Sequence, residues 1–109
     1  MSDFNDYQRK TGDTAIYPAR QALEYLTLGL VSEAGEIAGK VKKIIRDKSG
    51  RFEKEDFDDL LAEAGDVLWY LARFVDLIGF DLSEAADHNL EKLKSRSARG
   101  VLIGSGDKR

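Results

Sequence analysis

A chain of 109 residues, 42% of them hydrophobic, has material for one core, so we expect a single domain over residues 1–109. The net charge of −3, the lack of a membrane-length apolar run and the lack of a secretory signal predict a cytoplasmic protein that binds neither a membrane nor a nucleic-acid polymer. Without cysteine and with His88 as its one histidine, the chain must hold any metal through oxygen ligands.

The first half of the chain predicts a short helix followed by a long one. One proline and ten glycines among 34% charged residues favour long amphipathic helices. Residues 2 to about 11 predict a short helix with Ser2 as its cap, and residues 12–17 a loop. Pro18 suits the first turn of a long helix that ends near Asp47. The apolar stripe of this helix comprises Leu23, Leu26, Leu30, Ala34, Ile37, Val41 and Ile44.

The second half predicts two more helices and a tail. After a break at Ser49 and Gly50, the same spacing predicts a long helix that Gly79 ends. Its stripe comprises Phe57, Leu60, Leu61, Ala64, Val67, Leu68, Leu71, Phe74, Val75 and Ile78. Ser83 is placed to cap a third substantial helix, which carries Ala86, Leu90 and Leu93. Residues 99–109, with glycine at 100, 104 and 106, predict an irregular tail.

Some bulky residues, such as Ile45 and Trp69, fall outside the main stripes. One small domain offers few partners for them, although single exposed apolar residues are common. We therefore predict an all-α fold, a compact bundle of about four helices that is completed by oligomerisation.

Two acidic pairs on the long helices nearly repeat each other: Glu33-Ala34-Gly35-Glu36 and Glu63-Ala64-Gly65-Asp66. Residues three apart on a helix lie on neighbouring turns, so each pair can direct two carboxylates to one place. Glycine inside a helix costs about 1 kcal/mol relative to alanine, so the two glycines suggest a close approach of the helices. We expect all four carboxylates to converge.

Four convergent carboxylates repel one another unless a cation offsets their charge. Mg²⁺, a hard cation that prefers oxygen, fits such a site. The alternative interpretation is that acids three apart are ordinary solvated helix surface.

The same strip carries Lys40 and Lys43 on the first long helix, and Asp59 and Tyr70 on the second. On the third, Asn89, Lys92 and Arg96 share a face and offer an amide and two cations, as recognition of phosphate and base requires. Alternatively these groups are solvated surface, with Glu36 and Lys40 forming an i, i+4 pair.

The pattern E-x-x-E, a spacer over residues 37–62 and then E-x-x-D resembles the MazG-like all-α nucleoside triphosphate pyrophosphohydrolases, as do Asn89-x-x-Lys92 and the tail. The resemblance implies hydrolysis of a nucleoside triphosphate between its α and β phosphates, with Mg²⁺ required, Mn²⁺ as a substitute, and a homodimer or homotetramer. It maps Glu33, Glu36, Glu63 and Asp66 onto catalytic metal ligands. The candidates for substrate binding are Lys40, Lys43, Tyr70, Asn89, Lys92 and Arg96.

The sequence is also compatible with other functions. Enzymes of the same fold include base-specific dUTP or dCTP pyrophosphatases and the phosphoribosyl-ATP pyrophosphohydrolase of histidine synthesis. A non-catalytic helical interaction protein would carry the same acids as plain surface. In the tail, Lys108 and Arg109 could close over phosphates, with Gly104 and Gly106 freeing the backbone N–H groups.

Overall fold

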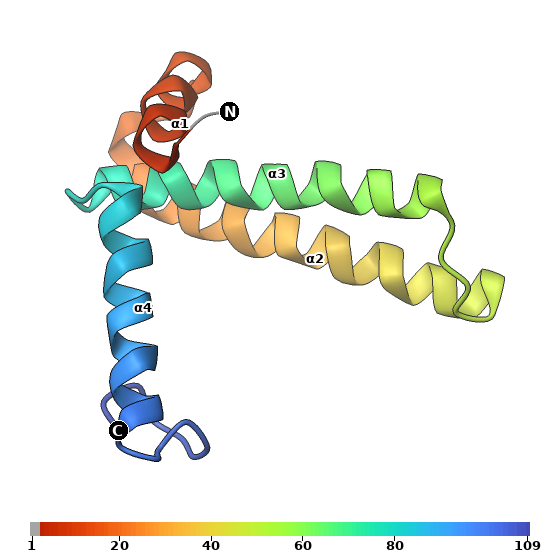
Figure 1. Cartoon of the computed structure of the whole chain (residues 1–109). Helices are drawn as coiled ribbons and strands as arrows, with labels where there is room; N and C mark the ends of the chain where they lie inside the picture. Colours follow the sequence, from red (N-terminus) through yellow and green to blue (C-terminus); the bar gives the residue numbers. More distant parts are fainter. Residues whose placement is uncertain (1–2) are drawn as a thin grey trace.

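The computed structural model describes residues 3–109, and this part of the chain is helical without strands (Figure 1). The four α-helices are α1 (Phe4–Thr11), α2 (Ala22–Lys48), α3 (Lys54–Leu77) and α4 (Leu82–Ala98). Two 3₁₀ turns, η1 (Gly12–Thr14) and η2 (Ala19–Gln21), join α1 to α2. The predicted all-α fold of about four helices and the irregular tail after Ala98 are confirmed.

The helix starts differ from the predicted ones in detail. The suggested cap Ser2 lies outside the described residues, and the N-cap of α1 is Asp3, whose side chain accepts a hydrogen bond from the backbone of Asp6 at 2.7 Å. Pro18 precedes η2, so α2 begins four residues later than the proline suggested. Ser83 does not cap α4.

The N-cap of α4 is Asp81, two residues before the predicted one. Asp81 has extended backbone, and its N–H donates to the Glu84 side chain at 3.1 Å. This pairing needs an acid three residues after the cap, which Asp81 has and Ser83 lacks.

The turn between α2 and α3 is tight and uses left-handed backbone. Ser49 has φ of 54° and Gly50 has φ of 76°, and the Gly50 N–H returns to the Ile44 carbonyl at 3.2 Å. This geometry ends α2 in the way that Ser49 and Gly50 predicted. Because residues 49–53 are few, α3 runs back antiparallel along α2 and the two form a long hairpin (Figure 1).

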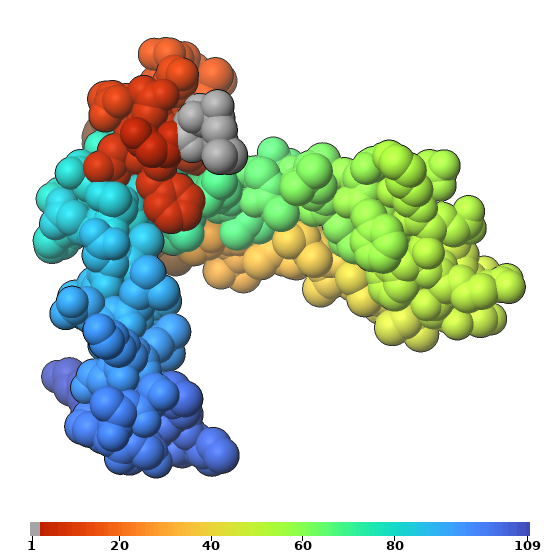
Figure 2. Space-filling model, viewed as in Figure 1, coloured from red at the N-terminus to blue at the C-terminus, as the bar shows by residue number. Residues whose placement is uncertain are grey.

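A second turn, with Gly79 at φ of 91°, sends α4 away from the hairpin at a steep angle. The space-filling view shows the hairpin and α4 as two arms that meet beside α1 (Figure 2). The radius of gyration is 16.9 Å, whereas a globular domain of this length has about 13 Å. The single chain is therefore more open than the compact bundle we expected, because α4 packs against α1 and the end of α3 instead of along the hairpin.

The best-buried core lies where α1, α3 and α4 meet. Ala72, Val75 and Leu82 form its centre. The side chains packed around them are Tyr7, Leu68, Leu71 and Phe74. Burying this apolar surface holds the corner between the two arms together.

Gln8 ties the three helices together through its buried amide, which is 4% exposed. Its Nε2 donates to the carbonyls of Ala72 (3.3 Å) and Phe80 (3.1 Å), and its Oε1 accepts from the N–H of Leu82 at 2.9 Å. The Leu82 N–H is in the first turn of α4, where it has no partner within the helix. No local sequence pattern indicates this role of Gln8, because it depends on contacts between residues more than sixty positions apart.

Arg73 reinforces the same corner from α3. It is 9% exposed, its Nε donates to Thr11 Oγ1 at 2.9 Å, and its guanidinium also donates to the Gln8 carbonyl at 3.0 Å. The C-terminal end of α1 is thus held by charge-assisted hydrogen bonds from α3.

Replacing Gln8 by alanine leaves the Leu82 N–H and the Phe80 carbonyl without their partner. We expect a loss of about 2 kcal/mol or more in the free energy of unfolding, since a buried unpaired polar group costs about 1–3 kcal/mol. Urea denaturation followed by circular dichroism measures this loss. Gln21→Ala, at an exposed glutamine, is the matched control and should change stability little. Equal effects of the two substitutions would contradict the assigned role.

The long helices leave much apolar surface uncovered. The predicted stripe residues Leu26 and Ile44 are buried, but Phe57 and Leu61 are 57% and 73% exposed. Ile45, outside the stripe, is 61% exposed. Among the described residues, no helix combines the length and apolar character needed to cross a membrane.

Candidate metal centre

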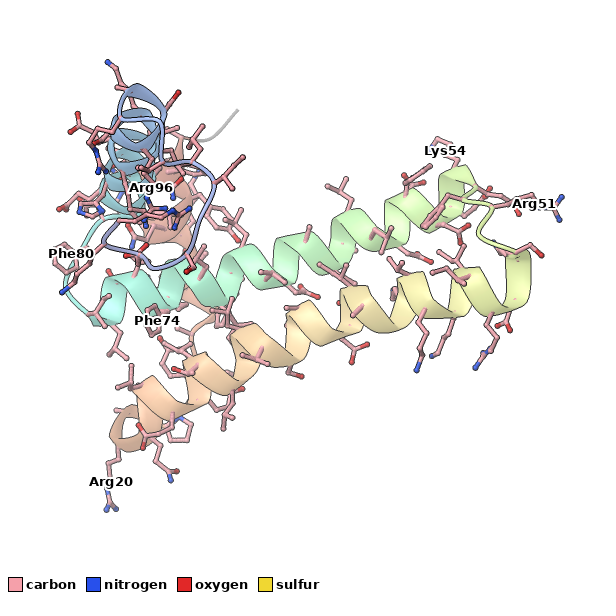
Figure 3. The ribbon with its side chains drawn as sticks, turned by 90° about the horizontal axis from the view of Figure 1, so that it is seen from below. Arg20, Arg51, Lys54, Phe74, Phe80 and Arg96 are labelled. Atoms are coloured by element: carbon pink, nitrogen blue, oxygen red, sulfur yellow. The ribbon has the colours of Figure 1, made fainter. Side chains whose placement is uncertain are left out.

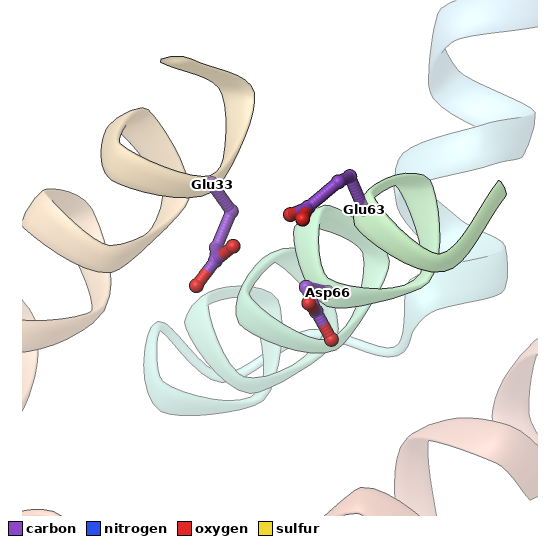
Figure 4. A group of neighbouring side chains, drawn as sticks. All are labelled: Glu33, Glu63 and Asp66. Carbon is purple, nitrogen blue, oxygen red and sulfur yellow. The ribbon is translucent and has the colours of Figure 1, made fainter. Parts of the chain in front are cut away.

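Three carboxylates meet midway along the hairpin, between α2 and α3. Glu33 extends from α2 toward Glu63 and Asp66 of α3 (Figure 4). One oxygen from each of the three side chains lies within 4.8 Å of the other two. Glu33 and Glu63 are half-buried and Asp66 is exposed, so the cluster is accessible from solvent. We call these three residues the acidic cluster.

Glu36, the fourth predicted ligand, is exposed and is not a member of this cluster. Glu36 is three positions after Glu33, so its side chain leaves α2 in a direction about 60° away from that of Glu33 and about one turn further along the axis. Glu63 and Asp66 both lie opposite Glu33, so α3 contributes its whole pair while α2 contributes one acid. The structure thus brings together three of the four predicted carboxylates.

The electrostatics of the cluster are unfavourable without a cation. Partial burial raises the pKa of Glu33, and the negative charges of Asp66, Glu63 and Glu36 raise it further. Lys40 supplies part of the missing positive charge: its Nζ lies 3.2 Å from Glu63 Oε1, and this contact raises the pKa of Lys40. A divalent cation would offset the remaining repulsion.

The donor set fits a hard divalent ion. Mg²⁺ prefers carboxylate oxygens. Glu33, Glu63 and Asp66 each offer one within 4.8 Å of the other two, so these three residues would hold the ion after side-chain movements. Neither sulfur nor imidazole is present in the cluster, which disfavours softer metals.

The predicted close approach at Gly35 and Gly65 is wrong. A Cβ atom on either glycine would meet nothing within 4 Å. The tight contact is instead at Gly29, where a Cβ would lie 2.1 Å from Cε1 of Tyr70. Gly29 lies four residues before Glu33 and therefore on the same side of α2.

Tyr70 belongs to a group of four rings beside the acids, formed by Tyr17, Tyr25, Trp69 and Tyr70, which we call the aromatic cluster. Ring centroids are 5.5 Å apart for Tyr17 and Tyr25, 6.3 Å for Tyr25 and Tyr70, and 5.1 Å for Trp69 and Tyr70. Trp69 is therefore partly covered within its own chain instead of being surplus surface. Tyr70 was predicted as a site residue from its helix position, whereas Tyr17 and Tyr25 were not, because only the tertiary fold places them beside it.

Burial raises the pKa of the Tyr70 hydroxyl, as do the neighbouring Tyr25 hydroxyl and the charges of Glu33 and Asp66. Tyr70 is thus within electrostatic reach of the acidic cluster. The aromatic cluster and the acidic cluster therefore adjoin each other.

The lysines of α2 lie on the other side of the acids. Lys40 and Lys43 line a hollow of about 230 Å³ toward the turn between the helices. The other residues around it are Ile44, Asp47, Lys48, Asp56 and Asp59. Lys48 is paired with Asp56 at 3.0 Å. We call this site the lysine hollow; it also places the predicted Asp59 beside both lysines.

The α4 candidates lie apart from the acidic cluster within one chain. Lys92 Nζ lies 2.7 Å from Asp107 Oδ1, and Arg96, 6% exposed, binds the Asp107 carbonyl and lies 3.3 Å from its carboxylate. Figure 3 shows Arg96 beside the folded tail. Asn89 is exposed on the same helix. The Asp107 carboxylate of the tail thus pairs with Lys92 and Arg96, the two cations that were predicted to bind substrate.

Arg109 forms hydrogen bonds within the tail. Its guanidinium donates to the carbonyls of Val101, Leu102 and Gly106 at 2.8–3.0 Å. Gly104 and Gly106, with φ of 128° and 88°, allow the chain to fold back in this way. The predicted closure of Arg109 over phosphates would require these bonds to break.

Residues 21–101 match the sequence profile of the MazG nucleotide pyrophosphohydrolase domain. The chain therefore belongs to this family, whose members are typically metal-dependent, and the resemblance stated from the acidic pairs is confirmed. The match covers α2, α3 and α4 and includes both acidic pairs.

A relative with high similarity is the Gene 37 protein of Mycobacterium phage L5. The two sequences are 52% identical over 109 aligned positions, which cover 94% of this chain and 96% of the relative. No solved structure matches the chain.

The raised pKa of Glu33 predicts how stability depends on pH. The folded state holds this proton more tightly than the unfolded state, so ionised Glu33 destabilises the fold, and stability falls as pH rises above its usual pKa of 4.5. Without metal, Glu33→Gln should therefore melt at a higher temperature than wild type at pH 7, and the difference should shrink toward pH 4.

Thermal melts in EDTA over this pH range measure the effect. Glu91→Gln, at an exposed glutamate of α4, is the control and should not reproduce it. A Glu33→Gln variant that is less stable than wild type at pH 7 would refute the repulsion argument.

Proposed function

We propose that this protein is an enzyme that hydrolyses ribo- and deoxyribonucleoside triphosphates to the monophosphate and pyrophosphate with Mg²⁺. The observation that carries the proposal is the acidic cluster, three carboxylates from two helices at the centre of a MazG domain. Three carboxylates that face one another across two helices repel one another, and a bound cation would offset that repulsion. The cluster therefore favours an enzyme over a non-catalytic interaction protein.

In this proposal Glu33, Glu63 and Asp66 hold the metal, and Glu36 joins them by a side-chain rotation from its exposed position one turn away. When bound, Mg²⁺, or Mn²⁺ in its place, would neutralise charge on the triphosphate and lower the pKa of the attacking water. A carboxylate oxygen of the same group that is not bound to the metal accepts the proton of that water.

Substrate contacts come from groups beside the cluster. Lys40 and Lys43 provide positive charge for the phosphates, and Tyr70 borders the acids on the other side. Asn89, Lys92 and Arg96 complete the candidate set. For Lys92 and Arg96, substrate binding requires that a phosphate displace the Asp107 carboxylate.

The test is to incubate the protein with each of the eight common nucleoside triphosphates and Mg²⁺ and to identify the products. We expect pyrophosphate and the monophosphate, no turnover in EDTA, and a fall in kcat/KM of at least about a hundredfold for Glu33→Gln, since loss of a metal ligand removes several kcal/mol of transition-state stabilisation. Glu91→Gln should retain activity.

Orthophosphate as the sole phosphate product, or full activity of Glu33→Gln, would contradict the proposal. With dUTP added to the panel, turnover restricted to dUTP or dCTP would identify a base-specific enzyme. Phosphoribosyl-ATP is added to the panel, because its exclusive hydrolysis would identify the histidine-synthesis activity.

We also propose that the chain forms a homodimer or homotetramer. Leu28, Val31 and Leu61 are 70%, 67% and 73% exposed on the hairpin, and association would bury them. Light scattering coupled to size-exclusion chromatography should give two or four times the chain mass of 12.2 kDa. Leu61→Asp should lower this mass, whereas Lys54→Asp, on an exposed polar position of α3, should not. A monomeric wild type would contradict the proposal.

A further inference from the structure

Lys40 places a positive charge directly on the acidic cluster. Its Nζ lies 3.2 Å from Oε1 of Glu63, across the space between α2 and α3. The Glu63 side chain is 16% exposed, so water and salt screen this ion pair only in part. In the described part of the chain, Glu33 and Asp66 form no ion pair. Lys40 therefore offsets the charge of the cluster through Glu63 alone.

A metal ion and the Lys40 ammonium group compete for Glu63. This residue is one of the three carboxylates that would hold the ion. A carboxylate that binds a divalent cation attracts a second cation less strongly, and the two cations repel each other at this range. Metal binding therefore weakens the ion pair between Lys40 and Glu63.

Asp59 offers Lys40 another partner. It precedes Glu63 by four residues, so the two acids lie one turn apart on the same side of α3. Lys40 and Asp59 line the same hollow, and after the contact with Glu63 the charge of Asp59 raises the pKa of Lys40 further. Among residues 3–109, Asp59 forms no ion pair, whereas Asp56, closer to the turn, pairs with Lys48 at 3.0 Å.

Glu36 is a further acid whose charge acts on Lys40, and it lies four residues before Lys40 on α2. In the proposed function Glu36 joins the metal ligands, so it does not accept the ammonium group once the metal is bound. Asp59 has no such role. It is therefore the acceptor that remains for Lys40 in the metal-bound protein.

From these contacts, and resting on the metal site of the proposed function, we infer that Lys40 is a built-in counter-ion that the metal displaces from Glu63 to Asp59. Wild-type protein then binds Mg²⁺ more weakly than the carboxylates would without Lys40. The ammonium group stays paired in both states, because one ion pair replaces the other. Only in the metal-loaded protein is Lys40 released from the acidic cluster.

A supporting role of Lys40 predicts the opposite effect on metal binding. If Lys40 stayed on Glu63 in the metal-bound protein, it would orient this ligand, and loss of such a partner typically weakens metal binding by about tenfold to a hundredfold. A displaced counter-ion competes with the metal, so its removal strengthens binding. The sign of the change in Mg²⁺ affinity therefore distinguishes the two roles.

The first experiment measures Mg²⁺ binding to the full chain by isothermal titration calorimetry, without nucleotide. Lys40→Gln should bind Mg²⁺ about fivefold more tightly than wild type, because the metal no longer has to open a partly exposed ion pair. Lys40→Arg keeps the charge and should not bind more tightly. Lys42→Gln, at an exposed lysine outside the hollow, should change the affinity by less than about twofold, since solvent screens its charge.

Thermal melts give a second readout of the same exchange. In EDTA, Lys40→Gln should melt at a lower temperature than wild type, because the repulsion among the three carboxylates is then uncompensated. In saturating Mg²⁺ the difference should shrink, because the bound ion stabilises the variant more than the wild type. A difference of the same size in both conditions would contradict the inference.

Asp59→Asn tests where Lys40 goes. In the wild-type background this substitution should weaken Mg²⁺ binding by about threefold, because the displaced ammonium group loses its new partner. Asp58→Asn, at a neighbouring acid that pairs with Lys54, is the control for loss of negative charge and should have less effect. In the Lys40→Gln background the effect of Asp59→Asn should fall to that of the control, and this double-mutant cycle isolates the pairwise contribution. Equal effects of Asp59→Asn in both backgrounds would refute the transfer.

Unchanged or weaker Mg²⁺ binding by Lys40→Gln would overturn the inference and leave the metal site intact. If Lys40→Gln does not fold, the comparison of Asp59→Asn with Asp58→Asn decides, and equal effects overturn the inference. Glu33→Gln should abolish Mg²⁺ binding; if it binds like wild type, or if wild type and Lys40→Gln both bind no Mg²⁺ at millimolar concentration, the metal site and the inference are both refuted. None of these measurements requires turnover, so the predicted pattern in a protein that releases no pyrophosphate would refute the proposed hydrolysis and keep the role of Lys40.

Discussion

The register of α2 against α3 is the constraint on which the candidate site depends. Near the short turn, Lys48 meets Asp56; further along, Lys40 meets Glu63; and beyond the acids, Gly29 receives the ring of Tyr70. Each of these contacts is consistent with one antiparallel alignment of the two helices. A shift of one residue would rotate the facing side chains by about 100° and separate the carboxylates. Ion pairs at one end and close packing at the other therefore hold the acids opposite one another.

The cost of this arrangement is electrostatic. Bringing Glu33 against Glu63 and Asp66 raises the pKa of Glu33, and Lys40 offsets only part of the repulsion. Buried apolar contacts elsewhere must supply the compensating stability, and the best-buried ones lie at the corner between α1, α3 and α4. Gln8 at this corner also satisfies the first N–H of α4. The fold thus separates its stabilising core from an open acidic centre in which like charges repel one another.

Local sequence features predicted most of the helices and only part of the site. The stripes and the breaks at Gly50 and Gly79 identified the helices to within a few residues, because apolar periodicity and left-handed turns are local properties. Caps were less certain, since Ser83 and Asp81 both suit that role and the choice depends on the acid at Glu84. The close approach predicted at Gly35 and Gly65 was wrong, because the sequence does not show which glycine of a helix contacts the neighbouring helix.

The sequence by itself determined that the chain is helical, that two acidic pairs lie on long helices and that the last residues are irregular. Spacing along one helix defines which residues share a face, and that information is complete within a few turns. Only the tertiary structure decided that Glu33 joins both acids of α3 while the exposed Glu36 lies outside the cluster, and that Tyr17 and Tyr25 lie beside Tyr70. In the tertiary structure α4 also points away from the hairpin, so Lys92 and Arg96 pair with Asp107 and not with the acidic cluster. These outcomes depend on the register of the hairpin and on the corner at Gln8, both set by contacts between residues far apart in the chain.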